Sequence, residues 1–276
     1  MSSSLPAECH IGRVALVVND LDDLTAFYRD VVGLHVLARE EGRATLGVGD
    51  TPLLLLREDA DAPARPSTAA GLFHTAFLVP SRAALGDALE RVRDRWRLGG
   101  ASDHLVSEAI YLTDPEGNGI EIYRDRPREA WTETEGGIAI DTLPLDLDAV
   151  ATEAAGEEAM PEGTTVGHVH LEVSDIEATR AFYVDALGLE LQATYGDSAL
   201  FLAAGGYHHH LGANVWHHRS RPPEGRGLAW FEVVLPDEAS LEATAERLRA
   251  AGHAVTSAGE GLDVVDPSGI TLRLRS

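Results

Sequence analysis

Short runs of alternating hydrophobic and polar positions, each closed by Asp, Gly or Pro, mark out the elements of this chain. Residues 11–34 read IGRVALVVNDLDDLTAFYRDVVGL. The alternation predicts a strand, the Asp turn caps a helix, and the helix ends near the aromatic pair Phe27-Tyr28. After Gly33, three more short strands are expected at 35–42, 43–49 and 51–58. This β-α-β-β-β order predicts a unit that curls into half a barrel.

The same pattern recurs three more times. Residues 166–189 repeat 11–34 at an offset of 155, pairing Asp20 with Asp175, Phe27 with Phe182 and Gly33 with Gly188. Two further pairs of segments also match each other, namely 71–93 with 227–249 and 114–123 with 266–274. The chain therefore predicts an α+β fold in which four βαβββ modules pair into two incomplete barrels.

The repeats divide the chain into two halves. We expect an N-terminal domain at 1–126 and a C-terminal domain at 164–276, each with two modules. The intervening residues 127–163 are acidic, rich in small residues and poorly periodic, which indicates a connector with one short helix at 145–154. No third domain is expected.

Composition limits the partners. The chain has 276 residues, with 45 acidic residues against 22 basic ones, all of them Arg, for a formal charge of -23. Nucleic acids and anionic membranes attract positive surfaces, so neither is an expected partner. A hydrophobic fraction of 44% argues against an acidic disordered chain. A salt-rich, halophilic cytosol explains this surface, and an acidic protein from a GC-rich genome is the alternative.

Cysteine content and targeting signals indicate a cytoplasmic protein. Cys9 is the single cysteine, which excludes an internal disulfide or a cysteine-based metal cluster. No run approaches the roughly 18 apolar residues of a membrane span. The N-terminal residues show no signal peptide.

Candidate chemistry appears where the repeats differ. At three positions of the repeat, one copy has a residue type that binds metals and its counterpart in the other copy does not. These residues are His168, His74 and Glu121. Their counterparts in the other copies are Arg13, Trp230 and, depending on the alignment, Leu272 or Arg273. A lone strand histidine is usually structural, but two imidazoles and a carboxylate in equivalent positions of a repeat match a 2-His-1-carboxylate site. Such a site holds Fe(II) on one face and leaves the opposite positions open for substrate and dioxygen.

Two further clusters contain histidines. His208, His209 and His210 fall within an expected strand at 207–216. Alternate strand residues point to opposite faces, so the three cannot all face one barrel. His104 lies seven residues before Tyr111, and an ordinary loop histidine with a hydrogen-bonded tyrosine would also explain this pair.

The segment that contains His104 and Tyr111 resembles a known family signature. His104, the run Ile110-Tyr111-Leu112-Thr113-Asp114-Pro115-Glu116-Gly117 and Glu121 resemble the sequence signature of type I extradiol ring-cleavage dioxygenases, departing from it at Ser102. The whole chain is similar to the catechol 2,3-dioxygenase branch of the vicinal oxygen chelate (glyoxalase/bleomycin resistance) superfamily. The stretches that carry this wider similarity are 72–80, 107–127, 167–176 and 205–216.

The resemblance implies roles for particular residues. It implies that His74, Glu121 and His168 bind Fe(II), with Mn(II) as the alternative metal. His209 matches the active-site histidine of the family, although a shift of one residue would give this role to His208 or His210. Finally, it implies that Tyr111 and His104 form an acid–base pair beside the metal.

The halves differ from the family pattern. Familiar members carry all three ligands in the C-terminal half, whereas here that half supplies only His168, and the N-terminal half supplies His74 and Glu121. We therefore expect module two to pack against module three around the metal, and modules one and four to form a barrel without metal. The alternative takes His10 as third ligand within the N-terminal half.

The implied activity is Fe(II)-dependent extradiol (meta) cleavage of catechol or a substituted catechol by dioxygen, in aromatic hydrocarbon catabolism. The product would be of the 2-hydroxymuconic semialdehyde type. Two other functions remain open: a glyoxalase-like lyase or epimerase that uses another divalent metal, and a metal-free protein that binds small aromatic molecules. Ring substituents and oligomeric state, including a homo-oligomer, are left undecided.

Overall fold

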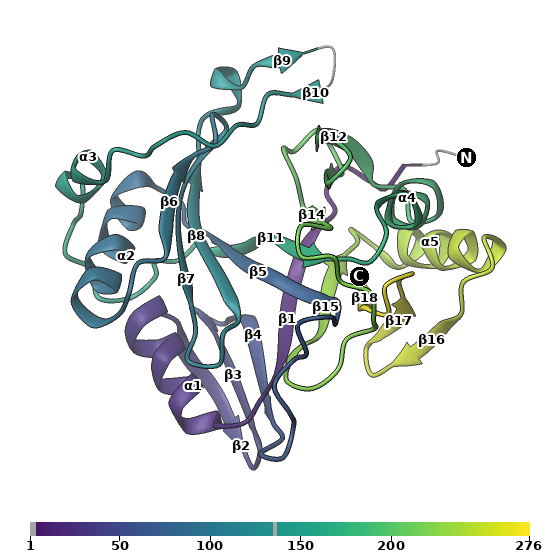
Figure 1. Ribbon diagram of the computed structural model, residues 1–276, viewed down its shortest axis with the longest axis horizontal. Helices are drawn as coiled ribbons and strands as arrows, with labels where there is room; N and C mark the ends of the chain where they lie inside the picture. Colours follow the sequence, from purple (N-terminus) through teal and green to yellow (C-terminus); the bar gives the residue numbers. More distant parts are fainter. Residues whose placement is uncertain (1–3, 135–136) are drawn as a thin grey trace.

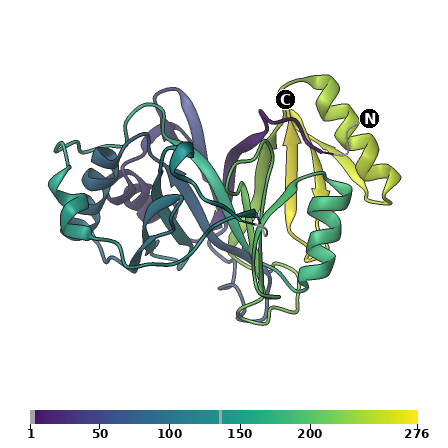
Figure 2. The same cartoon turned by 90° about the horizontal axis from the view of Figure 1, so that it is seen from above.

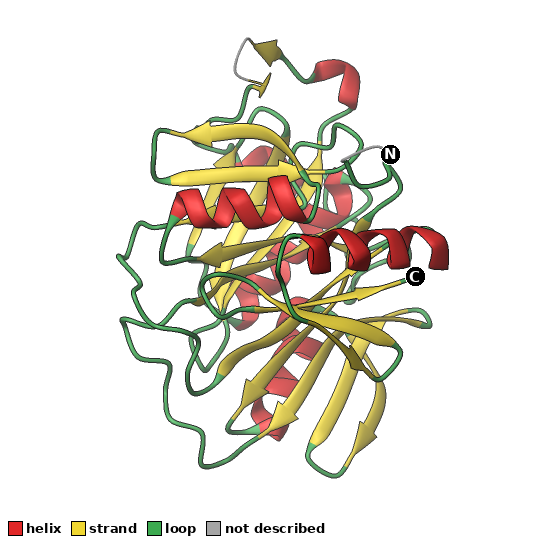
Figure 3. Ribbon diagram, turned by 90° about the vertical axis from the view of Figure 1, so that its right-hand side faces the viewer, coloured by secondary structure: helices red, strands yellow, loops and turns green. Residues whose placement is uncertain are grey.

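Two curved eight-stranded sheets form the frame of the molecule (Figure 1). The computed structural model describes residues 4–134 and 137–276. Residues 1–3, within the segment expected to lack a signal peptide, and residues 135–136 of the connector lie outside the described residues. Strands make up most of the regular structure, and the helices lie against the sheets (Figure 3).

Each of the first two modules has the expected order of one strand, one helix and three strands. Module one consists of β1 (His10–Val18), α1 (Leu21–Phe27) with a π-helical turn η1 (Tyr28–Val32), β2 (His35–Glu40), β3 (Arg43–Val48) and β4 (Thr51–Glu58). Module two consists of β5 (Gly71–Leu78), α2 (Arg82–Arg95), β6 (Gly100–Asp103), β7 (Ser107–Thr113) and β8 (Gly119–Asp125).

The C-terminal modules repeat this order. Module three consists of β11 (Thr165–Glu172), α4 (Ile176–Arg180) with the π-helical turn η3 (Ala181–Ala186), β12 (Glu190–Tyr195), β13 (Ala199–Ala203) and β14 (Leu211–Asn214). Module four consists of β15 (Gly227–Val234), α5 (Glu238–Ala250), β16 (Val255–Ala258), β17 (Gly261–Val265) and β18 (Thr271–Arg275). The predicted fold of four βαβββ modules is confirmed.

Each sheet draws strands from both halves of the sequence. The first sheet, in the order β16-β17-β18-β15-β1-β4-β3-β2, joins modules four and one. The second, in the order β12-β13-β14-β11-β5-β8-β7-β6, joins modules three and two. The helices of the N-terminal half lie on one side of the molecule and those of the C-terminal half on the other (Figure 2). The expected packing of module two against module three is confirmed.

The repeated turn residues begin and end the helices. Asp20 and Asp175 precede α1 and α4, and each side chain accepts a hydrogen bond from the backbone N–H three residues later. This bond satisfies an N–H that has no partner inside the helix. Gly33 and Gly188 follow the two helical segments with φ of 95° and 96°, a left-handed conformation that a side chain would strain.

The repeated tyrosines do more than fill the core, which is the simplest interpretation of their spacing. Tyr28 donates a hydrogen bond of 3.1 Å to Asp114, and Tyr183 donates one of 3.1 Å to Asp266. Tyr28 belongs to module one and Asp114 to module two, so their bond joins the two sheets. The second bond joins modules three and four in the same way.

The connector lies against module two. It contains η2 (Arg128–Ala130), β9 (Glu133–Thr134), β10 (Gly137–Ile138) and α3 (Leu147–Thr152), the last within the expected helix at 145–154. α3 packs against α2, and backbone hydrogen bonds join Leu143 to Asp103 in β6. Among the described residues, no helix has the length and apolar character needed to cross a bilayer.

Candidate metal centre

Three adjacent strands at the centre of the second sheet carry the predicted ligands. His74 lies on β5, Glu121 on β8 and His168 on β11, and β5 pairs with both of the other strands. Ala76 of β5 is the register partner of His168 on one side and of Glu121 on the other. Its methyl group leaves space between the two longer side chains.

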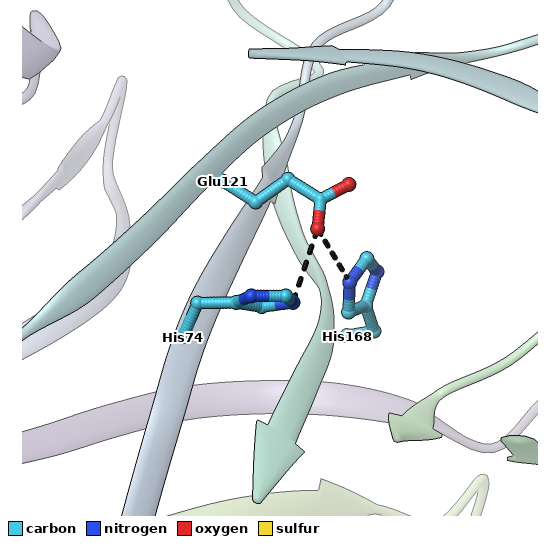
Figure 4. A group of neighbouring side chains, drawn as sticks. All are labelled: His74, Glu121 and His168. Carbon is cyan, nitrogen blue, oxygen red and sulfur yellow. Dashed lines mark hydrogen bonds and ion pairs between the residues drawn. The ribbon is translucent and has the colours of Figure 1, made fainter. Parts of the chain in front are cut away.

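The three side chains point toward one another (Figure 4). Glu121 Oε2 lies 3.0 Å from His74 Nε2 and 3.2 Å from His168 Nε2. One ligand atom from each residue lies within 4.8 Å of the other two, and all three residues are buried. Two ligand atoms that bind the same metal ion at about 2.1 Å each, with a right angle between the two bonds, are about 3 Å apart. The spacing therefore fits a shared ion.

The protonation of these groups also suits a metal. Burial lowers the pKa of His168 to about 4, so its ring is neutral and has a lone pair at neutral pH. Burial raises the pKa of Glu121, but the imidazoles of His168 and His74 outweigh this effect and lower it well below its usual range. Among the described residues, the buried Nε2 atom of His74 has no hydrogen-bond partner and contacts the Glu121 carboxylate at ion-pair distance. A divalent cation would satisfy all three groups.

A cavity of about 500 Å³ adjoins these residues. This volume is typical of a small-molecule site. Its polar wall includes two of the three ligands and three other predicted site residues: His74, Glu121, His104, Tyr111 and His209. Its aromatic wall consists of Phe73, Tyr195, Phe201 and Trp216. The arrangement can hold a flat aromatic molecule beside a metal.

His209 is the member of the histidine run that faces this cavity. Its buried ring has its centroid 4.1 Å from that of His168. His208 instead lies with Nε2 2.8 Å from Asp125 Oδ1, and His210 Nδ1 accepts a hydrogen bond from a backbone N–H. The expected strand at 207–216 is wrong at both ends, because β14 covers only Leu211–Asn214. The three rings diverge because of a bend and not through strand alternation.

The partners of His209 determine which of its nitrogens carries the proton. As a carboxylate, Asp125 only accepts, so His208 Nε2–H donates to it. With Nε2 of His208 as the donor to Asp125, Nδ1 of His208 is the acceptor of the second bond, in which His209 Nδ1–H donates at 2.7 Å. Burial lowers the pKa of His209 well below its usual range. His209 is therefore neutral, with an unprotonated Nε2.

Tyr111 and His104 are hydrogen-bonded to each other. Tyr111 Oη lies 2.6 Å from His104 Nε2, and His104 Nδ1 lies 2.6 Å from the backbone oxygen of Asp141. A carbonyl oxygen only accepts, so Nδ1–H of His104 donates to it, which leaves Nε2 as the acceptor of the Tyr111 proton. Burial, with the nearby Glu121 carboxylate, raises the pKa of Tyr111 well above its usual range. The phenol therefore stays protonated.

Sequence reasoning did not identify two parts of the cavity wall, His170 and the connector segment 140–142. His170 lies on β11 two residues after His168, lines the cavity, and is bonded through Nε2 to the side chain of Asn214 at 3.0 Å. Strand alternation already places it on the same face as His168. The connector segment 140–142 also lines the cavity, and nothing in its sequence pattern indicates this.

The alternative ligand His10 lies elsewhere. It is an exposed residue of β1, in the first sheet, with Nδ1 3.1 Å from the backbone oxygen of Glu8. The described residues place it outside the cluster of His74, Glu121 and His168. The positions of the ligands thus favour the pairing of modules two and three over a site within the N-terminal half.

Paired βαβββ half-barrels with polar side chains converging at the centre of one sheet define the vicinal oxygen chelate fold. The chain belongs to the Glyoxalase/Bleomycin resistance protein/Dioxygenase superfamily, whose family model matches residues 10–122 and 165–274. Glyoxalase I from Zea mays has the same fold, with a TM-score of 0.61 at 17% identity over 97% of this chain and 92% of that one.

Two curated relatives are dioxygenases. The chain is 40% identical to catechol-2,3-dioxygenase of Bacillus subtilis (strain 168) over 274 residues, 96% of each chain. It is 27% identical to biphenyl-2,3-diol 1,2-dioxygenase 3 of Rhodococcus globerulus over 160 residues, 55% of this chain and 84% of the relative. The expectation of an enzyme, an oxidoreductase of the extradiol dioxygenase type, is confirmed.

Proposed function

We propose that this protein cleaves catechol or a substituted catechol with dioxygen, in a reaction that depends on Fe(II). The ring would open beside the diol and give a product of the 2-hydroxymuconic semialdehyde type. The observation that carries the proposal is the buried cluster of His74, Glu121 and His168 beside an aromatic-walled cavity. The identity to a catechol-2,3-dioxygenase along nearly the whole chain supports the choice of substrate.

His74, Glu121 and His168 would hold the metal. Two imidazoles and one carboxylate would leave a divalent ion with a net positive charge and with coordination positions open. An Fe(II) ion bound here supplies acidification of a catechol hydroxyl and a path for electrons from the substrate to dioxygen. All other steps fall to side chains of the cavity.

His209 would act as the base on one side of the substrate. Its unprotonated Nε2 can take a proton and later return it, while Nδ1–H stays bonded to His208. The carboxylate of Asp125 behind His208 stabilises the positive charge that His209 then carries. The neutral resting state of a buried imidazole suits this task.

Tyr111 would receive the proton of a catechol hydroxyl. Its own O–H points to His104 Nε2, so the lone pairs of Oη remain to accept a hydrogen bond from the substrate. A proton arriving at Oη can displace the phenolic proton onto His104, whose Nδ1–H is held by the carbonyl of Asp141. The pair thus forms a two-step path from the cavity toward the connector.

The cavity wall suits a neutral aromatic ring. Phe73 and Trp216 meet edge to face with their ring centroids 5.5 Å apart, and Phe201 packs against His209 with centroids 5.1 Å apart. A flat ring placed against these side chains buries apolar surface and needs no electrostatic attraction. A neutral substrate therefore agrees with the charge of -23 on the chain.

Reconstitution with Fe(II) without oxygen, followed by catechol and air, tests the proposal. We expect a yellow ring-fission product that forms in proportion to the iron bound. Protein that holds a metal but leaves catechol intact, and instead converts a glyoxalase substrate, would favour the lyase or epimerase. Full binding of a small aromatic ligand by metal-free protein without turnover would favour the binding protein.

A further inference from the structure

The first sheet contains a counterpart of the candidate metal centre that is built from different chemistry. The positions equivalent to the three proposed ligands hold Arg13, Trp230 and Arg273. Strand register decides the last assignment, which the sequence left between two residues. Ala76 of β5 pairs with Glu121, and the matching Glu232 of β15 pairs with Arg273. Neither arginine nor tryptophan is a metal ligand.

A cavity of about 360 Å³ lies over these positions. One row of paired residues along its wall is Ala38, Thr45, Leu55 and Ala15. The matching row in the second sheet is Ala193, Phe201, Gly212 and His170, three of which line the cavity at the candidate metal centre. The two cavities therefore occupy equivalent places in the two half-barrels.

Trp230 forms a fixed aromatic surface in this cavity. The guanidinium of Arg273 lies 4.1 Å from the centre of the indole ring and is itself held by Asp263 through two hydrogen bonds of 2.7 and 3.0 Å. Arg13 is bound in the same bidentate way to the buried Glu232, at 2.9 and 2.6 Å. The charge of each of these two arginines is thus balanced by a carboxylate, and the two guanidinium groups hold the indole ring in place.

Two other arginines of the cavity wall have no such partners. Arg43 and Arg57 are directly opposite each other on β3 and β4. Within 4–134 and 137–276, the side chain of neither one makes a hydrogen bond or an ion pair. Glu40 also lines the cavity and is the register neighbour of Arg43, but it forms no ion pair with it. Like charges directly opposite on adjacent strands destabilise a sheet.

We propose that this cavity binds a small aromatic carboxylate. The ring lies against Trp230 and Leu55, and the carboxylate lies between Arg43 and Arg57. A guanidinium pairs with a carboxylate through two parallel hydrogen bonds, so one anion relieves the repulsion between both arginines. A cavity of about 360 Å³ accommodates a single substituted ring. The site needs no metal and is separate from the proposed catalytic centre.

Titration calorimetry of the full chain with benzoate, in low salt, tests the proposal. We expect the paired substitutions Arg43→Gln and Arg57→Gln to weaken benzoate binding by at least about tenfold, since each removes a charge-assisted contact. Arg221→Gln is the matched control, because Arg221 is exposed and lies outside the cavity, and it should leave binding unchanged. Benzamide, which has the ring without the charge, and acetate, which has the charge without the ring, should each bind at least about tenfold more weakly.

His168→Ala separates the two cavities. Benzoate binding should persist in this variant while iron binding and catechol cleavage are lost, because His168 belongs only to the second sheet. No measurable binding of benzoate to the wild-type chain would overturn the proposal. Equal affinity in the paired arginine variant, or loss of binding in His168→Ala, would overturn it as well.

Discussion

The protonation of His209 is set by the two residues behind it. Asp125 holds the proton of His208 on Nε2, and His208 in turn accepts the proton of His209 Nδ1. The same arrangement fixes the orientation of the His209 ring beside His168. A partner that positions a metal-binding imidazole commonly affects activity by about 10- to 100-fold, and we expect an effect of the same size for this imidazole beside the metal centre.

Substitution of His208 tests this chain of hydrogen bonds. We expect His208→Leu to lower kcat for catechol by about 10- to 100-fold with little change in KM, because the ring of His209 loses its orientation but the cavity wall is unchanged. His208→Asn should restore much of the loss, since its amide oxygen can take the place of Nδ1 as acceptor. Steady-state kinetics of both variants give the answer. Equal losses in the two, or a change confined to KM, would contradict the assignment.

Asp266 gives a pH dependence of stability away from the candidate site. Burial raises its pKa from 3.8 to about 6, although Tyr183 and backbone N–H groups donate to it. Between these values the folded state binds more protons than the unfolded state, so this group favours folding at low pH. Its contribution is full below pH 4 and is lost as the pH rises through about 6. The shift corresponds to about 3 kcal/mol.

Asp266→Asn removes this dependence while keeping an acceptor for the backbone N–H groups. We expect wild type to gain stability relative to the variant as the pH falls from 7 to 4.5. Urea unfolding of both proteins at the two pH values measures the difference. A gap between them that does not change with pH would contradict the assignment.

At the scale of elements, the two tyrosine–aspartate bonds tie the helical segments to turns in the other sheet. Tyr28 is almost fully buried, with 1% of its surface exposed, so its hydroxyl depends on Asp114 for a partner. Asp114 in turn holds the turn before β8 through the backbone N–H groups of Glu116 and Asn118. The turn precedes the strand that carries Glu121.

Tyr28→Phe measures the strength of this connection. The variant keeps the packed ring but leaves the Asp114 carboxylate short of one donor, so we expect a loss of about 1–2 kcal/mol in the free energy of unfolding. Tyr195→Phe is the matched control, because the Tyr195 side chain is 67% exposed, and its stability should not change. Equal effects of the two substitutions on urea unfolding would show that the buried hydrogen bond adds nothing.

The elements could be predicted from the sequence wherever periodicity is strong. Alternation and the recurring turn at Asp20 and Asp175 indicate the βαβββ modules, because a strand or a helix imposes its own spacing. The bend at 207–210 was missed, since three identical side chains in a row carry no alternation. Backbone hydrogen bonds between Leu143 and Asp103 hold the connector residues 140–142 at the cavity. Backbone hydrogen bonds do not depend on which side chains are present, so the sequence pattern does not indicate them.

At the scale of the whole molecule, the proposed centre exists only because the halves share their sheets. His168 comes from the C-terminal half, and His74 and Glu121 come from the N-terminal half, on three neighbouring strands. The sequence indicated this arrangement because neither half contains all three residues. The partners of His104 and His209 could not be predicted in the same way, since Asp141 and Asp125 meet them only in the folded chain.

The iron content of ligand variants tests the central claim most directly. After Fe(II) reconstitution and removal of free metal, we predict one iron per chain in wild type and less than about a tenth of this in His74→Ala and His168→Ala. Substitution of a residue that only supports a ligand already lowers metal affinity by about 10- to 100-fold, and loss of a ligand itself lowers it further. His10→Ala, which removes the alternative ligand, should keep its iron. Circular dichroism confirms that each variant is folded. Full iron retention in folded His168→Ala, or its loss in folded His10→Ala, would contradict the account.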